Sequence, residues 1–387
     1  MSVSRLSGTP GGVARRPGPA PAWFAANRRN ILVALALFAL SEVVAWIVAA
    51  AYGHWGLGEA LDLRSFCRWD CGWYGGIVRY GYHAAPAYHP AGDAANWAFF
   101  PLWPALAGGF RWLTGLREDY SLLLLGSLVL LLCIFLFIVF VEDHGIAIGP
   151  WLAGSLVAFN PYVLYAHAGY TEPLYFALGT GALLALRRDR WLAAGLLGGA
   201  CSATRLVGTF LVLPMLVRFV GRDHGGGGAR SVPPLEKLLG IALVPLGVTL
   251  FGWHLYGLTG DLLAFAHIQV AWQHELRNPL DVWWQAFRHP GGSMFAALIA
   301  LWALLAAVHL WRRRMPEYGL LLVATSLLPL CTTIVSMPRY VFWQPVFLLG
   351  LADVMGRRLV ALLVIPASLV GGVLMIIAWF AGLPFVV

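Results

Sequence analysis

Long apolar runs constrain this chain more than any other feature. Runs of about 20 residues, the length that a helix needs to cross a bilayer, recur from residue 31 to residue 380. Of the 387 residues, 60% are hydrophobic and 11% are charged, whereas soluble domains carry roughly 25% charged residues. The runs do not alternate between apolar and polar residues, which excludes an outer-membrane barrel. The sequence therefore predicts an all-α polytopic membrane protein.

The basic residues predict the direction in which the chain crosses the membrane. The formal net charge is +8, and Lys237 is the single lysine. Arginines gather in short loops between apolar runs, and loops of this kind stay on the cytoplasmic side. Since topology explains these charges, we expect no nucleic-acid partner. The clusters lie at residues 187–190, 218–222, 312–314 and 357–358.

Counting outward from these clusters predicts about eleven transmembrane helices. Residues 1–27, rich in Gly, Pro, Ala and Arg, are expected to form a disordered cytoplasmic tail, and residues 28–387 a single transmembrane domain. External loops would cover residues 52–119 and 257–292. The predicted spans are residues 31–51, 120–141, 147–168, 171–186, 191–204, 206–219, 238–256, 294–311, 318–334, 340–354 and 359–380.

Residues 99–114 are apolar but cannot be a span, because both of their ends lie outside in this topology. We expect them to lie along the outer interface or to enter the membrane and return.

The five cysteines form no recognisable disulfide framework. Cys133, Cys201 and Cys331 lie in apolar runs and are expected to be small core residues. Cys67 and Cys71 are four residues apart, and on one helix their Cβ atoms would be poorly placed for a bridge, so we expect no disulfide between them. Neither Cys nor His shows metal-type spacing, so no metal site is predicted, although a requirement for a divalent metal stays open.

Asp70 is the candidate catalytic residue. It lies in the first predicted external loop, between Trp69 and Trp73. Desolvation by indole rings raises the proton affinity of a carboxylate, which suits a general base. The same pattern also fits an interfacial aromatic belt with an acidic residue that caps a helix.

Three further ionisable residues, Glu172, Arg205 and Arg339, fall at the outer membrane surface in this topology. Ionisable groups at membrane depth are costly and are therefore candidates for function. Two arginines opposite a carboxylate-bearing loop could bind a phosphate, whereas a single arginine there would snorkel. Thr171 and Glu172 also fit an ordinary helix start, with Thr171 as the cap. Glu42, inside the first span, stays open between a buried pairing and a proton-linked role, and the scattered histidines favour no metal site.

Several short motifs follow one another along the chain. They are Trp69-Asp70-Cys71-Gly72-Trp73-Tyr74, Gly81-Tyr82, Ala98-Phe99-Phe100-Pro101-Leu102-Trp103-Pro104, Tyr170-Thr171-Glu172-Pro173, Thr204-Arg205 and Pro338-Arg339-Tyr340. In this order they resemble the motifs of the PIG-V-like mannosyltransferases, which are the GPI mannosyltransferases of the second-mannose type and their bacterial relatives. The resemblance covers roughly residues 31–355, and that family belongs to the GT-C superfamily of polytopic glycosyltransferases.

The resemblance implies a GT-C-like fold, with interfacial helices in the first external loop, and a reaction. A polyprenyl-phosphate sugar, with mannose as the expected sugar, would be the donor. The sugar would pass with inversion to a hydroxyl of a lipid or glycan acceptor on the non-cytoplasmic face. Asp70 would act as general base, and Arg205 and Arg339 would bind the donor phosphate. No cofactor is implied, and the protein would reside in the plasma membrane of a bacterium. The remaining substrate-binding candidates are Trp69, Trp73, Tyr74, Tyr82, Tyr170, Thr171, Glu172 and Tyr340.

The main alternative is a polytopic transporter or lipid flippase without transferase activity. Transporters often carry internal repeats and broken helices near the membrane midplane. This sequence shows no internal repeat, and its candidate charges gather at one face, which favours the transferase. A non-catalytic partner subunit and a transferase for another lipid-linked sugar stay open as well.

Overall fold

The computed structural model describes residues 20–54, 63–86, 94–221, 232–272, 274–356 and 358–383 of the chain. Regular structure in these ranges is helical, apart from an isolated bridge residue at Ala94, so the prediction of an all-α protein is confirmed. Helix α1 begins at Ala20. Residues 20–27, which we expected in a disordered tail, are therefore helical, and residues 1–19 lie outside the described residues.

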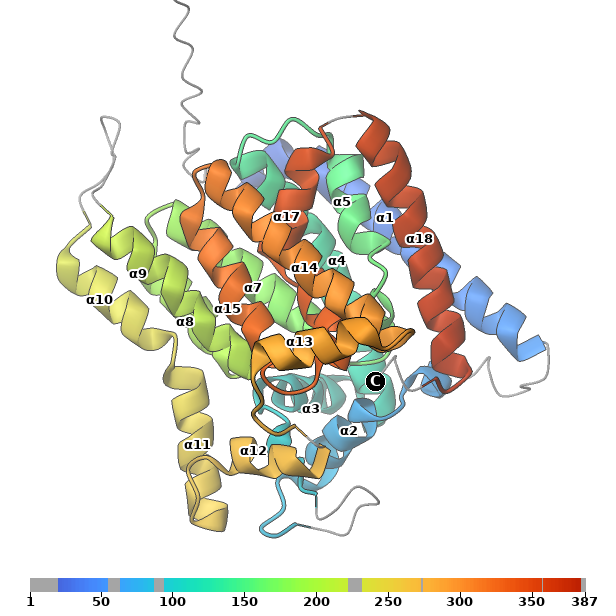
Figure 1. The fold of residues 1–387 in the computed structure, drawn as a ribbon, viewed down its shortest axis with the longest axis vertical. Coiled ribbons are helices and arrows are strands. Elements are labelled where there is room, and N and C mark those ends of the chain that lie inside the picture. The colour runs from blue at the N-terminus through green and yellow to red at the C-terminus, as the bar shows by residue number, and fades with distance from the viewer. Residues whose placement is uncertain are drawn as a thin grey trace, which may run out of the picture.

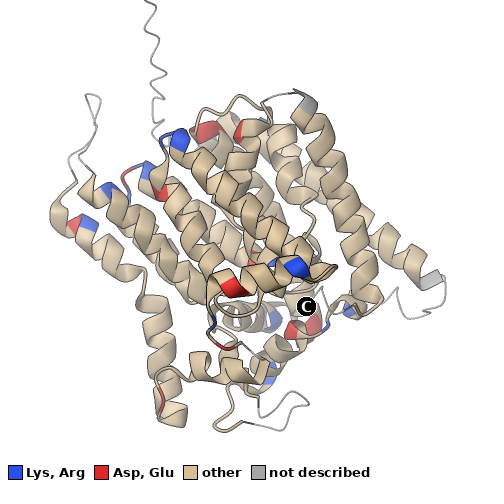
Figure 2. Cartoon of the chain, viewed as in Figure 1, with Lys and Arg blue, Asp and Glu red and all other residues tan. Residues whose placement is uncertain are grey.

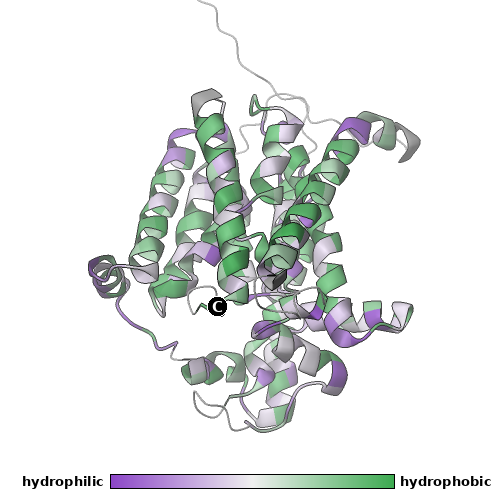
Figure 3. Ribbon diagram, turned by 90° about the vertical axis from the view of Figure 1, so that its right-hand side faces the viewer, coloured by the Kyte–Doolittle hydropathy of each residue, from purple (hydrophilic) through white to green (hydrophobic). Residues whose placement is uncertain are grey.

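Several helices are long and apolar enough to cross a membrane. Among the described residues there are four such helices, or five if the bent pair α10–α11 counts as one span. Outward-facing side chains on α1 and α18, such as Ile47 and Leu363, are apolar and exposed, which suits contact with lipid. Figure 3 shows the hydrophobic colouring that runs along the long helices. The chain is an integral membrane protein. The four long apolar helices are α1 (Ala20–His54), α4 (Glu118–Asp143), α14 (Gly292–Arg312) and α18 (Arg358–Phe380), and the bent pair is α10 (Pro234–Leu243) with α11 (Leu246–Thr259).

Among the described residues, fewer helices are long enough to cross a membrane than the eleven spans that we predicted. Several of the predicted spans are short or interrupted. Residues 147–168 divide into two helices at Asn160-Pro161, where proline lacks the N–H that a helix needs. The Asn160 side chain accepts a hydrogen bond from the Tyr162 N–H (2.8 Å) and donates one to the Phe342 carbonyl (2.6 Å). The short helices of this part of the fold are α5 (Pro150–Ala158), α6 (Leu164–His167), α7 (Glu172–Arg187), α8 (Trp191–Ser202), η3 (Leu206–Leu211) and α9 (Val212–Val220).

A second interruption divides the predicted span 340–354. The break lies before Pro345, and the Gln344 amide there donates hydrogen bonds to the Tyr175 hydroxyl and to Thr325 Oγ1, both at 3.0 Å. Buried polar groups thus stabilise each break instead of being left unpaired. The helices of this region are α15 (Pro316–Leu330), η5 (Ile334–Ser336), α16 (Met337–Phe342) and α17 (Pro345–Val354).

The two predicted external loops contain short helices. In Figure 1, α3 and α13 run crosswise to the long helices α14 and α15. The Leu102 N–H donates to the Ala203 carbonyl (3.0 Å), which joins the start of α3 to the end of α8. These elements are η1 (Leu63–Phe66), α2 (Asp70–Tyr80), η2 (Asn96–Ala98), α3 (Leu102–Thr114), α12 (Ala264–His267), η4 (Ile268–Trp272) and α13 (Pro279–Arg288).

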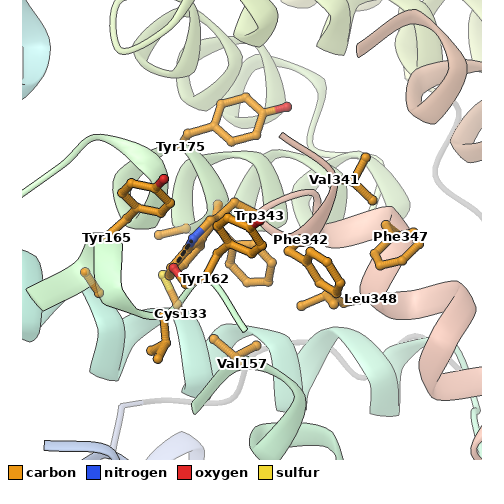
Figure 4. Packing of buried hydrophobic residues seen from close by; sticks show 14 of the residues in the cluster. Cys133, Val157, Tyr162, Tyr165, Tyr175, Val341, Phe342, Trp343, Phe347 and Leu348 are labelled. Carbon is orange, nitrogen blue, oxygen red and sulfur yellow. Dashed lines mark hydrogen bonds between the residues drawn. The ribbon is translucent and has the colours of Figure 1, made fainter. Parts of the chain in front are cut away.

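A buried core lies where α4, α6, α7 and α16 meet. Figure 4 shows part of it, including the Trp343 indole, whose N–H donates to the Tyr162 carbonyl at 2.9 Å. Cys133 and Trp343 are almost fully buried, and the Cys133 thiol donates to the Pro173 carbonyl (3.0 Å). Because Pro173 directly follows Glu172, this packing fixes the start of α7.

Ion pairs mark the opposite end of α7. Arg187 contacts Asp143 at 2.7 Å, and Arg218 contacts Asp189 at 2.9 Å. In Figure 2, several of the blue ribbon segments that mark Lys and Arg lie at the upper end of the helices. A helix of 16 residues is about 24 Å long, so this cluster lies about that far from Glu172.

Candidate functional site

Asp70 is the first residue of α2 and is held through its backbone. Its N–H donates to the Tyr170 hydroxyl, and the same hydroxyl donates to the Arg68 carbonyl, both at 3.2 Å. Trp69, just before it, has a φ of 49°, in the left-handed region that residues with side chains rarely adopt. This turn directs the Asp70 side chain toward Arg339, whose Nη1 lies 3.5 Å from Asp70 Oδ2.

Glu172 lies at the start of α7 and is the most buried of the four charged residues, with 2% of its side chain exposed. Its Oε1 pairs with Arg205 Nη1 and lies 2.8 Å from Arg339 Nε. The second oxygen, Oε2, has no hydrogen-bond partner among the described residues. One carboxylate oxygen thus holds two guanidinium groups together.

Thr171 has a different role from the helix cap that the sequence suggested. It occupies the N-cap position of α7, but its side chain makes no capping hydrogen bond. Instead Thr171 Oγ1 accepts a hydrogen bond from Arg205 Nη1 at 3.1 Å. The local reading as an ordinary helix start therefore misses the main contact of this residue.

The two arginines come from different elements of the helical bundle. Arg205 lies between α8 and η3, and Arg339 lies in α16. The Arg205 guanidinium lies 4.7 Å from the centre of the Tyr340 ring, and that of Arg339 lies 5.6 Å from the Tyr170 ring. Aromatic faces stabilise such cations where water is scarce.

The site balances its charges. Two carboxylates, Asp70 and Glu172, face two guanidiniums, so their formal charges sum to zero when both carboxyls are ionised. Burial raises the pKa of Asp70 above its usual value, although the Arg339 charge works in the opposite direction. Since 22% of the Asp70 side chain is exposed against 2% for Glu172, Asp70 is the carboxylate that a substrate could reach.

The predicted aromatic residues divide into two groups. Tyr74, Tyr170 and Tyr340 border the charged cluster. Trp73 stacks on Phe99, with ring centres 5.6 Å apart. Trp73 thus packs on another aromatic side chain of the first predicted external loop.

Tyr82 is engaged elsewhere. Its hydroxyl donates to the Phe99 carbonyl at 2.7 Å, and its ring packs against Phe251 and His254. Trp69 contacts Trp379 of α18 with ring centres 4.5 Å apart. Both therefore support the loop by packing.

Two residues of the site were missed by sequence reasoning. The Tyr165 ring lies 5.3 Å from the Arg339 guanidinium, and Trp379 packs against Tyr170. Aromatic residues inside apolar runs resemble lipid-facing side chains, so no local signal identified them.

Glu42 has a partner close to the site. Its Oε1 lies 3.4 Å from Nδ1 of His167, a residue of α6. Of the two readings left open for Glu42, this contact supports the buried pairing. No group of three or more His, Cys, Asp or Glu side chains able to hold a metal ion occurs in the part of the chain that the structure describes.

Cys67 and Cys71 form a disulfide, which corrects our expectation. That expectation placed both residues on one helix, but α2 begins at Asp70, so Cys67 lies on the preceding turn. The turn brings the two Cα atoms to 5.2 Å, within the normal range for a bridge. Disulfides persist in oxidising compartments, which agrees with an external position for this loop.

Comparison with known proteins gives one remote structural similarity. No protein-family model matches the chain, and no curated protein matches it by sequence. The fold is similar, with a TM-score of 0.42 and 14% sequence identity, to the crystal structure of the Archaeoglobus fulgidus oligosaccharyltransferase in complex with Zn and sulfate. The similarity covers 80% of this chain and 48% of the other, so this chain spans about half the length of that protein.

Proposed function

We propose that this protein is a membrane glycosyltransferase of the GT-C type that uses a polyprenyl-phosphate sugar as donor. One observation carries the proposal: Arg339 contacts both Asp70 and Glu172, while Arg205 pairs with Glu172 from another element. Two buried cations beside a more accessible carboxylate suit a reaction in which a hydroxyl attacks a sugar and a phosphate leaves that sugar. The motif resemblance supports mannose as the sugar and the PIG-V-like family as the relatives.

Asp70 is the general base in this proposal. Its carboxylate takes the proton of the acceptor hydroxyl while that oxygen attacks the anomeric carbon of the donor. The bond between the anomeric carbon and the phosphate oxygen breaks on the opposite side, so the configuration inverts. The products are the glycosylated acceptor, protonated Asp70 and polyprenyl phosphate.

Arg205 and Arg339 bind the donor phosphate and stabilise the charge that it gains as it leaves. Before the donor binds, Glu172 keeps the two guanidiniums close to each other despite their like charge. The phosphate oxygens then share those guanidiniums with Glu172, which is too buried to move out to solvent. The rings of Tyr340 and Tyr170 lie against these guanidiniums and help to hold them in place.

The direct test is transfer by purified protein with a panel of polyprenyl-phosphate sugars and a mixture of membrane glycolipids as acceptors. We expect transfer from the mannose donor, followed by mass analysis of the product. Asp70→Asn keeps the size of the side chain but removes the base, and we expect it to lower turnover by about 10²–10⁴-fold. Asp281→Asn, at an exposed position of α13, serves as the matched control. Near-normal turnover by Asp70→Asn would refute the base, and absence of transfer from every donor would refute the proposed function.

A further inference from the structure

The Cys67–Cys71 disulfide surrounds the proposed base. Arg68, Trp69 and Asp70 are the residues between the two cysteines. Cys71 is fully buried and Cys67 is partly exposed. The bridge therefore closes a five-residue ring that contains Asp70, and any rotation of this ring would move the carboxylate.

The backbone inside the ring has an unusual course. Trp69 takes a positive φ of 49°, and the Cys71 N–H donates to the Arg68 carbonyl at 3.2 Å. The Gly72 N–H donates to the Trp69 carbonyl at 2.9 Å. This hydrogen bond lies at the start of α2, whose first residue is Asp70. A bulky residue adopts such a φ only where its surroundings impose it. The bridge across this turn is the covalent part of those surroundings.

The other supports of the turn are weaker, non-covalent contacts at its edges. The Arg68 guanidinium donates to the carbonyls of Trp379 (3.0 Å) and Phe380 (3.3 Å) at the end of α18. The Tyr170 hydroxyl bridges the Arg68 carbonyl and the Asp70 N–H. These contacts place the turn against the bundle, whereas the disulfide joins the two ends of the turn covalently.

A ring this short adds little to global stability. The stabilisation from a cross-link grows with the logarithm of the loop that it closes, so five residues give a small effect. Cys71 is one member of the main buried cluster, and the members on α4, α6, α7 and α16 lie outside the ring. The consequence of the bridge is therefore local and falls on the position of the Asp70 carboxylate relative to Arg339.

We propose that the Cys67–Cys71 disulfide is a positioning element of the site, and that a dithiol reductant lowers sugar transfer by releasing Asp70 without unfolding the bundle. This inference rests on the proposed function, because it assigns the bridge to the same carboxylate. In the reduction, the S–S bond accepts two electrons and two protons and becomes two thiols, while the dithiol becomes a cyclic disulfide. Partly exposed Cys67 gives the attacking thiolate its access.

The first measurement is independent of activity. Peptide mapping of purified, oxidised protein should find residues 67 and 71 linked, and hydrogen exchange should be slow over residues 66–74. After treatment with dithiothreitol, and in the Cys67→Ser/Cys71→Ser double variant, we expect faster exchange in this segment and unchanged exchange in α4 and α7. Free thiols at both positions, or unchanged exchange after reduction, would overturn the inference whatever the activity of the protein.

The second measurement is transfer itself. We expect reduction or the double variant to lower kcat by roughly 10–100-fold, since a displacement of about 1 Å costs rate on that scale, with a smaller change in donor KM. Reoxidation should restore the wild-type protein but not the double variant. Cys331→Ser, which removes a free cysteine, is the control and should respond as the wild-type protein does. If the oxidised protein transfers sugar and reduction leaves kcat unchanged, the positioning role is refuted. If the oxidised protein transfers no sugar at all, only the proposed function is refuted.

Discussion

At the scale of single residues, Arg339 has the most demanding position. Its Nη1 lies beside Asp70 and its Nε beside Glu172, so one side chain spans both carboxylates. The planar guanidinium has nitrogens at both places, whereas an ammonium is a single point of charge. Charge alone therefore does not reproduce this contact.

Arg339→Lys should consequently damage the site while keeping its charge. We expect kcat/KM for the donor to fall by about 10–100-fold, the equivalent of losing one charge-assisted hydrogen bond of roughly 1.5–3 kcal/mol. Steady-state kinetics with varied donor would measure it. Arg288→Lys, at an exposed position of α13, should leave kcat/KM unchanged. Unchanged donor kinetics in both Arg205→Ala and Arg339→Ala would contradict the phosphate contact.

The raised pKa of Asp70 predicts how transfer depends on pH. A base must be unprotonated to accept a proton, so the rate falls as pH drops through the pKa of that carboxyl. Because burial raises this pKa, the fall should begin at higher pH than for an aspartate in water, whose pKa is about 3.9. A profile of kcat/KM against pH would show its acid limb displaced upward. An acid limb at or below about pH 4 would contradict the buried environment.

At the scale of elements, glycines determine how α8 packs against α10 and α11. A Cβ on Gly195 would lie 2.2 Å from the Gly240 carbonyl oxygen, and one on Gly240 would lie 2.5 Å from the Trp191 carbonyl oxygen. Small residues allow helices to approach this closely within membranes. The position of Arg205, at the end of α8, depends on that packing.

Gly240→Val should therefore destabilise the fold. Forcing a side chain into this contact must separate the two backbones, which we expect to cost about 1–3 kcal/mol. Thermal unfolding in detergent would show a lower Tm. Gly257→Val, in α11 with open space around its Cβ position, is the matched control and should change the Tm much less. Equal effects in the two variants would attribute the loss to helix propensity and not to packing.

The sequence predicted different elements with unequal success. The uninterrupted runs that became α1, α4, α14 and α18 were found because apolar length is a strong signal. The breaks at Asn160-Pro161 and before Pro345 were missed, since averaged hydropathy hides one buried amide inside an apolar run. The expectation of no disulfide was wrong because it assumed a helix through Cys67.

The candidate site shows the same division. Asp70, Glu172, Arg205 and Arg339 were predicted because charge is rare in this chain and costly in a membrane. That Arg339 contacts both carboxylates while Arg205 pairs with Glu172 could not be predicted, because it depends on how four elements meet. Tyr165 gave no signal, since a tyrosine in an apolar run looks like any other core residue.

At the scale of the whole molecule, the site and the basic clusters lie at opposite ends of α7. Glu172 begins that helix and Arg187 ends it, in contact with Asp143. Clusters of Arg and Lys next to the ends of membrane-spanning helices lie preferentially on the cytoplasmic side. We therefore expect the site to face away from the cytoplasm.

Cysteine labelling would test this orientation. In a Cys331→Ser background, Trp112→Cys at the exposed end of α3 should react with a membrane-impermeant maleimide in intact cells. Arg190→Cys, exposed at the other end of the bundle, should react only after the cells are permeabilised. The reverse labelling pattern would show that the topology is inverted, and it would place the proposed reaction on the cytoplasmic face.

The hydrogen bonds between Arg68 and the end of α18 also have a consequence for the synthesis of the protein. Arg68 donates to carbonyls of residues 379 and 380, which are added to the chain more than 300 residues later. A chain that is still being synthesised and lacks α18 therefore cannot form these two hydrogen bonds. The turn that bears Asp70 gains this support only once α18 has been made, long after the first predicted external loop has left the ribosome.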